Sequence, residues 1–394
     1  MEKKNTNYLM EFGIIFLFLS TQIANVFRLY TGRQADIAPW IAVVSLLCIL
    51  NTKNSLRLNK EQTLLILYQI YIAVFATMCG TTLMQSGDGT IYILFIIAFT
   101  LVSATAKTIH GDKVPYFMWI VTGILNIMLT LYFSLEEIER FNAYSVNGVL
   151  LADRSVLATI GYFHLLAALT FKTEKKTTIL LKGVLIAASC YNIMVTLRRG
   201  MFVTLLIILA LHICLTFHPE LSFKLFLRAA MAAVIVYILY LTVPYIHRQI
   251  DSAIESVVNS VHTLLGKETS NQDISALIRA QNRTHILEEI KNFTLRDWLI
   301  GKGYNMGWID FPFLQCFYDM GIFGGTLYIV TQLMPFRYLF SRKRRMKNYE
   351  KLFFYLFIIS FVNNFYSGFP YGMAKFIYII PLLADWRDKE YYAV

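Results

Sequence analysis

Apolar runs long enough to cross a lipid bilayer follow one another along almost the whole chain. A membrane-spanning helix needs about 20 consecutive apolar residues, with a range of roughly 17 to 25. Twelve segments approach this length, and because several lie at its short end, eleven crossings are the alternative. They cover residues 8–27, 36–51, 62–80, 90–106, 114–134, 155–171, 178–197, 201–218, 224–246, 311–337, 352–368 and 370–384. The sequence therefore predicts an all-α fold, that of a polytopic integral membrane protein with 11–12 transmembrane helices.

The composition excludes the soluble classes of protein. Of the 394 residues, 57% are hydrophobic and 15% are charged, whereas soluble domains carry about 25% charged residues. This apolar surplus cannot be hidden in a soluble core, because the outside of the molecule must still be covered with polar atoms. The formal net charge of +11 does not indicate nucleic acid as a partner, since basic residues of a membrane protein first report its topology.

Lysine and arginine residues are concentrated in one of the two alternating sets of short loops. The loops at 52–61, 172–177 and 338–351 are rich in them, whereas the loops that alternate with these hold few. Cytoplasmic loops of membrane proteins carry such an excess. We therefore expect a multi-pass protein of the cytoplasmic (inner) membrane with its N- and C-termini in the cytoplasm.

One long hydrophilic segment, residues 247–310, interrupts the apolar runs and falls on the predicted outer face. It separates about nine transmembrane helices in residues 1–246 from about three more, with a short cytoplasmic tail, in residues 311–394. It is too short for a sizeable core of its own, so we expect one large extracytoplasmic loop that caps the membrane domain. Apolar residues between Ile250 and Leu265 recur at helical spacing and predict an amphipathic helix, and residues 274–290 predict a second helix.

The sequence contains no recognisable metal-binding or redox motif. The five cysteines all fall within predicted spans without a C-x-x-C, and the seven histidines have no second histidine at i+3 or i+4, so we predict neither a metal nor a cofactor. An Asp-x-Asp pair, which would hold a divalent ion on a diphosphate, is also missing from the sequence.

Two adjacent arginines, Arg198 and Arg199, lie at a turn between two apolar runs on the predicted outer face. Arginine binds phosphate through a planar fork, so such a pair at the membrane surface can grip a diphosphate without a metal. The alternative is that both side chains only snorkel to lipid headgroups. In the outer loop, Arg279 and Arg283 are four residues apart and share a helix face, although an exposed helix often carries two arginines.

A third group of candidates lies between residues 301 and 310, just before the span at 311–337. Glycines permit a tight backbone there, and the aromatic rings of Tyr304 and Trp308 can stack on sugars beside Lys302. Asp310 would be a carboxylate at the membrane edge, where partial desolvation raises basicity. Its alternative role is to cap the helix that follows.

The order of these features resembles that of the O-antigen ligase and polymerase superfamily. Residues 196–206 (TLRRGMFVTLL) resemble its S-R-G stretch before a large extracytoplasmic loop. Residues 279–303, which end in WLIGKG, resemble its R…P-L-F-G-x-G element. Residues 310–324, with DFPFL and GIFG, resemble its D/H-N-x-x-L…G-x-x-G element. The resemblance covers roughly residues 140–340, and beyond them only the hydropathy plan agrees.

The resemblance implies a bacterial Wzy-type polymerase of O-antigen, capsular or exopolysaccharide repeat units. Family ligases usually have His where this chain has Asp310, whereas polymerases often have Asp. The substrates would be undecaprenyl-diphosphate-linked glycans in the membrane lipid, with a flippase and a chain-length regulator as pathway partners. The residues expected to be catalytic are Arg199, Arg283 and Asp310, and those expected to bind substrate are Arg198, Arg279, Arg154, Lys302, Tyr304 and Trp308. A ligase of the same superfamily, a polysaccharide flippase or other transporter, and a non-catalytic subunit of an envelope assembly complex remain alternatives.

The predicted topology can be tested with reporter fusions. A periplasmic-type reporter such as alkaline phosphatase should be active when fused within 247–310 and inactive when fused within 172–177. The opposite pattern would reverse the orientation and remove the outer-face site.

Overall fold

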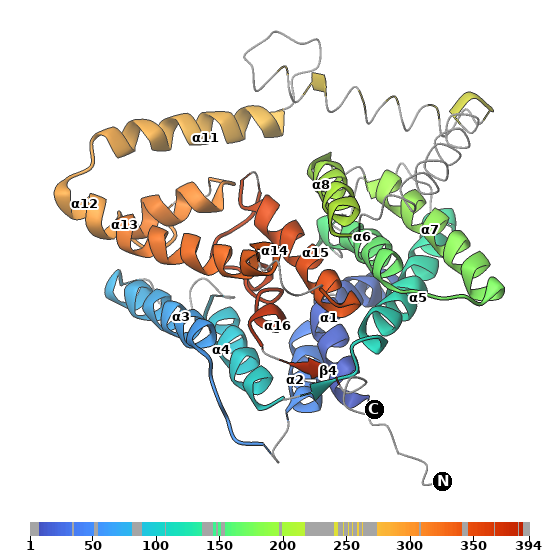
Figure 1. Ribbon diagram of the computed structural model, residues 1–394. Coiled ribbons are helices and arrows are strands. Elements are labelled where there is room, and N and C mark those ends of the chain that lie inside the picture. Colours follow the sequence, from blue (N-terminus) through green and yellow to red (C-terminus); the bar gives the residue numbers. More distant parts are fainter. Residues whose placement is uncertain are drawn as a thin grey trace.

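The computed structural model (Figure 1) describes most of the chain. The described residues are 8–33, 35–50, 54–80, 89–106, 108–135, 145–146, 149–150, 154–196, 199–216, 240–242, 274–306, 309–340, 346–365, 367–384 and 386–388, with single positions at 247, 251, 254, 258, 259 and 262.

Helices dominate the described residues, which confirms the all-α class. The strands are two residues long: β1 (Thr108–Ile109) pairs in parallel with β4 (Arg387–Asp388), and β2 (Ser145–Val146) pairs antiparallel with β3 (Val149–Leu150). The helices up to residue 216 are α1 (Leu9–Thr31), α2 (Ala38–Ile49), α3 (Lys60–Met78), α4 (Gly89–Thr105), α5 (Lys113–Leu135), α6 (Arg154–Thr170), α7 (Lys176–Thr196) and α8 (Arg199–Thr216). Those after it are α11 (Ile274–Lys291), α12 (Leu295–Ile300), α13 (Pro312–Leu333), the 3₁₀ turn η2 (Met334–Phe336), α14 (Arg337–Phe340), α15 (Asn348–Asn363), the 3₁₀ turn η3 (Met373–Lys375) and α16 (Ile380–Leu383).

Several helices have the length and composition of membrane spans. Within the described residues, four are long and apolar enough to cross a bilayer, namely Leu9–Thr31, Lys60–Met78, Lys113–Tyr132 and Pro312–Phe336. Shorter apolar helices cover Ala38–Ile49, Ile91–Thr105, Val156–Thr170, Thr204–Leu215 and Met373–Leu383. These helices indicate a membrane protein, whereas the number of 11–12 crossings stays a prediction. Of the span expected at 224–246 only residues 240–242 are described, and most of 247–273 lies outside the described residues.

The N-terminal helices form a bundle in which α1 packs on α2, α5 and α6, while α7 covers α5 and α6. Polar side chains inside it bond one another, since lipid offers them no partner. Asn192 Nδ2 donates to Asn126 Oδ1 at 2.8 Å, and Gln22 Nε2 donates to Thr159 Oγ1 at 2.9 Å. On the C-terminal side, α15 packs against α5, α6 and α8.

The two ends of the described chain lie on the same side of this bundle. Glu11 Oε1, near the start of α1, accepts a hydrogen bond of 2.7 Å from the backbone amide of His110, which directly follows β1. Because β1 pairs with β4 near the C-terminus, the beginning of α1 and residues 387–388 are neighbours. This arrangement agrees with termini on one face of the membrane. Which face is cytoplasmic stays a prediction.

The helix at the predicted span 311–337 is not straight, because α13 folds back on itself at Gly321. This residue has φ 62° and ψ −162°, which no right-handed helix contains. The rings of Phe313 and Tyr328 lie 5.6 Å apart, although 15 residues of straight helix would separate them by about 22 Å. The two arms of this hairpin, residues 312–320 and 322–333, therefore run side by side in opposite directions, and each is shorter than a membrane crossing by itself.

The second arm of α13 continues through η2 and α14 and lies along α3. The ring of Tyr68, in the middle of α3, lies 6.3 Å from that of Tyr328 between centroids, and its hydroxyl lies 3.4 Å from Cys316 Sγ of the first arm. Arg337 in α14 pairs with Glu61 at the beginning of α3. Residues 322–340, rather than α13 alone, thus form the segment that matches the length of α3.

Replacement of Gly321 by alanine tests the fold of α13. A Cβ at this position would lie 2.5 Å from the backbone of Leu299 and Ile300, and the left-handed conformation is costly for any other residue, so we expect Gly321→Ala to lower the free energy of unfolding by about 3 kcal/mol or more. Gly183→Ala in α7 is the matched control, because nothing lies within 4 Å of its Cβ position. Thermal unfolding in detergent measures both variants, and equal melting temperatures would contradict the hairpin.

Candidate functional site

The candidate site begins with two arginines on one face of α11. Arg279 and Arg283 are one helical turn apart, and both reach the start of α13. Arg279 Nε donates to Asp310 Oδ2 at 3.0 Å, and the Arg283 guanidinium carbon lies 5.2 Å from the centre of the Phe311 ring. The structure therefore brings together three residues that the sequence singled out: Arg279, Arg283 and Asp310.

A small apolar cluster keeps α11 in this position. Ile286 of α11 is buried against Ile309 and Tyr318, and Phe311 and Leu314 pack at its edge. The Tyr318 hydroxyl also donates to a Glu289 carboxylate oxygen. Burial of apolar side chains at the start of α13 thus sets the distance between the two arginines and Asp310.

Asp310 has both carboxylate oxygens engaged. Oδ2 accepts from Arg279, and Oδ1 accepts a 3.2 Å hydrogen bond from the backbone amide of Gly368, which follows α15. Its φ is 54°, a left-handed conformation that Asp tolerates better than most residues. The cap position of α13 is Phe311 and has no side-chain cap bond. Asp310 therefore joins α11 to the segment after α15, instead of capping α13 as its alternative role would require.

Arg283 is partly buried, and its N–H donors are not all hydrogen-bonded within the described residues. Its Nη2 lies 3.5 Å from the Phe365 carbonyl oxygen, at the limit of a hydrogen bond, and its buried Nε has no hydrogen-bond partner among the described residues. Burial lowers the pKa of Arg283 below its usual value, the charge of Arg279 lowers it further, and Asp310 opposes the shift. Arginine stays protonated in proteins. Arg283 is therefore a partly buried charged group whose Nε has no hydrogen-bond acceptor among the described residues, which is energetically costly.

Lys302 and Tyr304 contact the protein itself rather than the arginine pair. Lys302 Nζ pairs with Asp297 Oδ2 at 2.9 Å and lies 5.3 Å from the centre of the Phe293 ring. Tyr304 is 2% exposed and stacks on Tyr371 with centroids 4.7 Å apart. Burial raises the pKa of Tyr304 to about 12, and the charge of Asp319 adds to the shift. This position leaves no face of the Tyr304 ring open for the predicted stacking on a sugar.

The glycines of the G-x-G stretch, Gly301 and Gly303, allow the backbone to lie very close to α13. The amides of Lys302 and Gly303 donate to the carbonyl oxygens of Tyr318 and Asp319, both at 3.0 Å. Gly301 has φ 77°, and a Cβ there would lie 2.2 Å from the Asp319 carbonyl oxygen. Two backbones approach here without side chains between them. The tight backbone predicted from the glycines is thus present, but it holds the protein's own hairpin.

Asp319, Gly368 and Tyr371 complete the surroundings of this loop, and none of them was predicted. Asp319 is fully buried; its Oδ1 accepts from the Met306 amide at 3.2 Å, and its Oδ2 accepts from the Tyr371 hydroxyl at 2.9 Å. A carboxylate within a predicted span is a signal that could have identified Asp319. Nothing in the sequence marks Gly368, because its role depends on its backbone amide.

The remaining predicted residues are not placed at this site. Arg198 and Trp308 lie outside the described residues. Arg199 begins α8 and Arg154 begins α6, but the description does not extend to their side chains, so their roles stay predictions.

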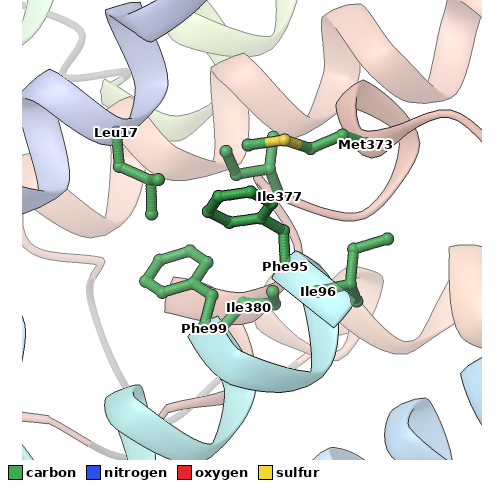
Figure 2. A pocket seen from close by; sticks show the side chains of 7 residues that line it. All are labelled: Leu17, Phe95, Ile96, Phe99, Met373, Ile377 and Ile380. Carbon is green, nitrogen blue, oxygen red and sulfur yellow. The ribbon is translucent and has the colours of Figure 1, made fainter. Parts of the chain in front are cut away.

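The described residues contain no group of three or more His, Cys, Asp and Glu side chains that could hold a metal ion. Figure 2 shows an apolar gap between α1, α4 and the C-terminal residues 373–380. Leu17, Phe99 and Met373 are among its lining residues, and it leaves no room for a water molecule. We interpret it as a packing gap remote from the arginines.

A double-mutant cycle tests the pairing within the site. Arg279 is 40% exposed and Asp310 18%, so we expect Arg279→Gln and Asp310→Asn to show a coupling energy of about 0.5–1 kcal/mol. Unfolding by SDS in mixed micelles measures the four proteins of the cycle. Lys302→Gln combined with Asp310→Asn is the control and should be additive. Additivity in the Arg279–Asp310 cycle would contradict the pairing.

Comparisons with protein-family models, with curated proteins and with solved structures find no match for this chain. Its function is therefore inferred from the residues and their arrangement alone.

Proposed function

We propose that this protein is a bacterial membrane glycosyltransferase that joins undecaprenyl-diphosphate-linked oligosaccharide repeat units into a polysaccharide. The reaction would take place at the outer face of the cytoplasmic membrane and need no metal. In this role the protein is a repeat-unit polymerase for O-antigen, capsule or exopolysaccharide. A flippase that delivers the units and a chain-length regulator would act in the same pathway.

One observation carries the proposal: the arginine pair stands at the end of a row of phenylalanine rings. Arg283 lies over Phe311, whose ring centre is 6.3 Å from that of Phe365. Phe365 is followed by Phe361 at 5.6 Å, and Phe313 lies 5.0 Å from Phe365. Phe365 is 48% exposed, while Phe313 and Phe361 are partly buried. Two cations beside an accessible apolar track suit a ligand with an anionic head and a hydrocarbon tail.

The proposed chemistry is a displacement at a sugar carbon. A hydroxyl of the acceptor unit attacks the anomeric carbon of the donor, the new C–O bond forms, and the bond to the lipid diphosphate breaks. The diphosphate leaves with the bonding electron pair, so negative charge grows on its oxygen in the transition state. Preorganised cations contribute most where charge develops. Arg283 and Arg199 are therefore proposed to stabilise the leaving oxygen. Arg279 and Arg198 would bind the rest of the diphosphate.

Asp310 is the proposed acceptor of the hydroxyl proton. Both of its oxygens are engaged in the ligand-free arrangement, so one donor must leave before the carboxylate can take a proton. Transfer of the Arg279 guanidinium from Asp310 to the diphosphate would free Oδ2 at the moment when substrate binds. Arg154, Lys302 and Trp308 remain proposed contacts for substrate, whereas the buried ring of Tyr304 stacks on Tyr371 instead.

A ligase of the same superfamily would use the same site to transfer a finished chain. A transporter is the second candidate, and it is favoured by a separate observation. The break at Gly321 in α13 and the buried charged residues Asp319 and Lys375 resemble the discontinuous helices and buried ionisable groups of secondary transporters.

Loss of the arginines tests the polymerase. In a strain whose surface polysaccharide depends on this protein, Arg283→Ala and Arg279→Ala should leave single repeat units, with polymer reduced at least about 100-fold. Arg283→Lys should fail as well, because lysine cannot bind a diphosphate through two parallel bonds. Gel analysis of the polysaccharide measures chain length, and Arg57→Ala, an exposed arginine outside the site, is the control. Normal chain length in the Arg283 variants would refute the proposal.

The location of the intermediates separates a polymerase from a flippase. Single units should accumulate on the outer leaflet, where an added glycosidase can reach them in spheroplasts. Units that are protected until the membrane is opened would instead indicate a failure of transport.

A further inference from the structure

The helix α12 presents four large apolar side chains to its surroundings, although it belongs to the hydrophilic segment 247–310. Leu295 is 78% exposed, and Trp298, Leu299 and Ile300 are 38–40% exposed. None of the six residues of α12 is buried, and Figure 1 shows the helix at the edge of the molecule. A contiguous apolar surface of this kind marks a contact surface.

This surface is held rigidly. Thr294 caps α12 through a 3.2 Å bond from the Asp297 amide to its Oγ1, and the Gly301 amide donates to the Asp297 carbonyl oxygen at 2.8 Å. On the other side, the backbone of Leu299 and Ile300 lies against Gly321 at the tip of the α13 hairpin. The exposed side chains therefore belong to a fixed element and not to a free loop end.

The loop that directly follows α12 lies next to the end of α3. A Cβ at Gly303 would lie 3.8 Å from Cys79 Sγ, directly after α3. Leu67, Ile70, Val74 and Met78 recur at helical spacing on α3 and are 46–80% exposed. Because α3 is long and apolar enough to cross a bilayer, this stripe is the side that faces lipid. α12, which ends at Ile300 just before this loop, thus lies close to the end of the lipid-facing stripe.

The flanking charges are those expected at lipid headgroups. Lys291 and Arg296 are exposed beside the apolar residues, while the carboxylate of Asp297 is paired with Lys302. The Trp298 ring forms T-shaped contacts with the rings of Phe293 and Phe317, with centroids 5.9 and 5.5 Å away. Tryptophan is enriched at membrane interfaces. Lysine and arginine side chains near an interface extend their charged ends towards the lipid phosphates.

We infer that α12 is an interfacial anchor, with Leu295, Trp298, Leu299 and Ile300 inserted between phospholipid chains and Lys291 and Arg296 at the phosphates. The partner is the phospholipid surface itself rather than another protein. Anchoring α12 also fixes the height of the loop 301–310, and with it the height of Asp310, relative to the bilayer. This inference does not depend on the proposed reaction.

Photo-crosslinking identifies the partner directly. The photoreactive residue p-benzoylphenylalanine replaces Leu295 in the full-length protein, which is illuminated in vesicles of phosphatidylcholine and phosphatidylglycerol. Mass spectrometry should find a phospholipid adduct with Leu295 replaced and none with Glu288 replaced, an exposed residue of α11. Adducts with protein only, or no adduct at Leu295, would overturn the inference.

Fluorescence provides a second measurement. In a variant that keeps Trp298 and has phenylalanine at the other four tryptophans, lipids brominated near the headgroup should reduce emission at least about two-fold, as for interfacial helices, and aqueous iodide should have little effect. A variant that keeps only Trp119, which is 4% exposed within the bundle, should respond to neither quencher. Iodide quenching of Trp298 without lipid quenching would contradict the anchor.

Discussion

The backbone contact between the loop after α12 and the break in α13 is the constraint on which the candidate site depends. Gly301 and Gly321 each leave a space that a Cβ would fill, and the amides of Lys302 and Gly303 bond the carbonyl oxygens of Tyr318 and Asp319. Inside a membrane, a broken helix must have its freed backbone groups satisfied by protein. The amides of Lys302 and Gly303 provide these hydrogen bonds. The α13 hairpin in turn fixes the position of the first residues of the loop 301–310, which leads to Asp310.

Two carboxylates extend this contact to the C-terminal part of the chain. Asp319 of α13 accepts a hydrogen bond from the Tyr371 hydroxyl, and Asp310 at the end of the loop accepts one from the Gly368 amide, so residues 368–371 contact both α13 and the end of the loop. Asp310 also pairs with Arg279 of α11. A charge buried without a partner would be costly, and the pairing of each carboxylate explains why this polar layer persists among apolar helices. The same layer keeps Arg283 partly buried with donor capacity left over, which is the property that an anionic ligand requires.

Local sequence patterns predicted much of this, but only where the physics is local. Apolar runs indicated helices at α1, α3 and α5, and the i, i+4 spacing of Arg279 and Arg283 put both on one face of α11. The prediction did not include the fold-back within α13, because a hydropathy pattern does not distinguish a straight span from two arms folded at a glycine. It was also incomplete at Tyr304, whose aromatic ring can stack on a ligand or on Tyr371 with the same sequence signature.

The sequence by itself determined that the chain is helical and built for a membrane, since both properties follow from the spacing and number of apolar residues. It also identified arginines and an aspartate as the polar groups with chemistry to offer. Only the tertiary structure decided that Asp310 meets Arg279 and Gly368, and that Arg283 meets Phe311 and Phe365. The reason is that these contacts join residues up to 82 positions apart. They depend on a backbone amide, a carbonyl oxygen and a helix break, and a sequence pattern does not encode the positions of these groups.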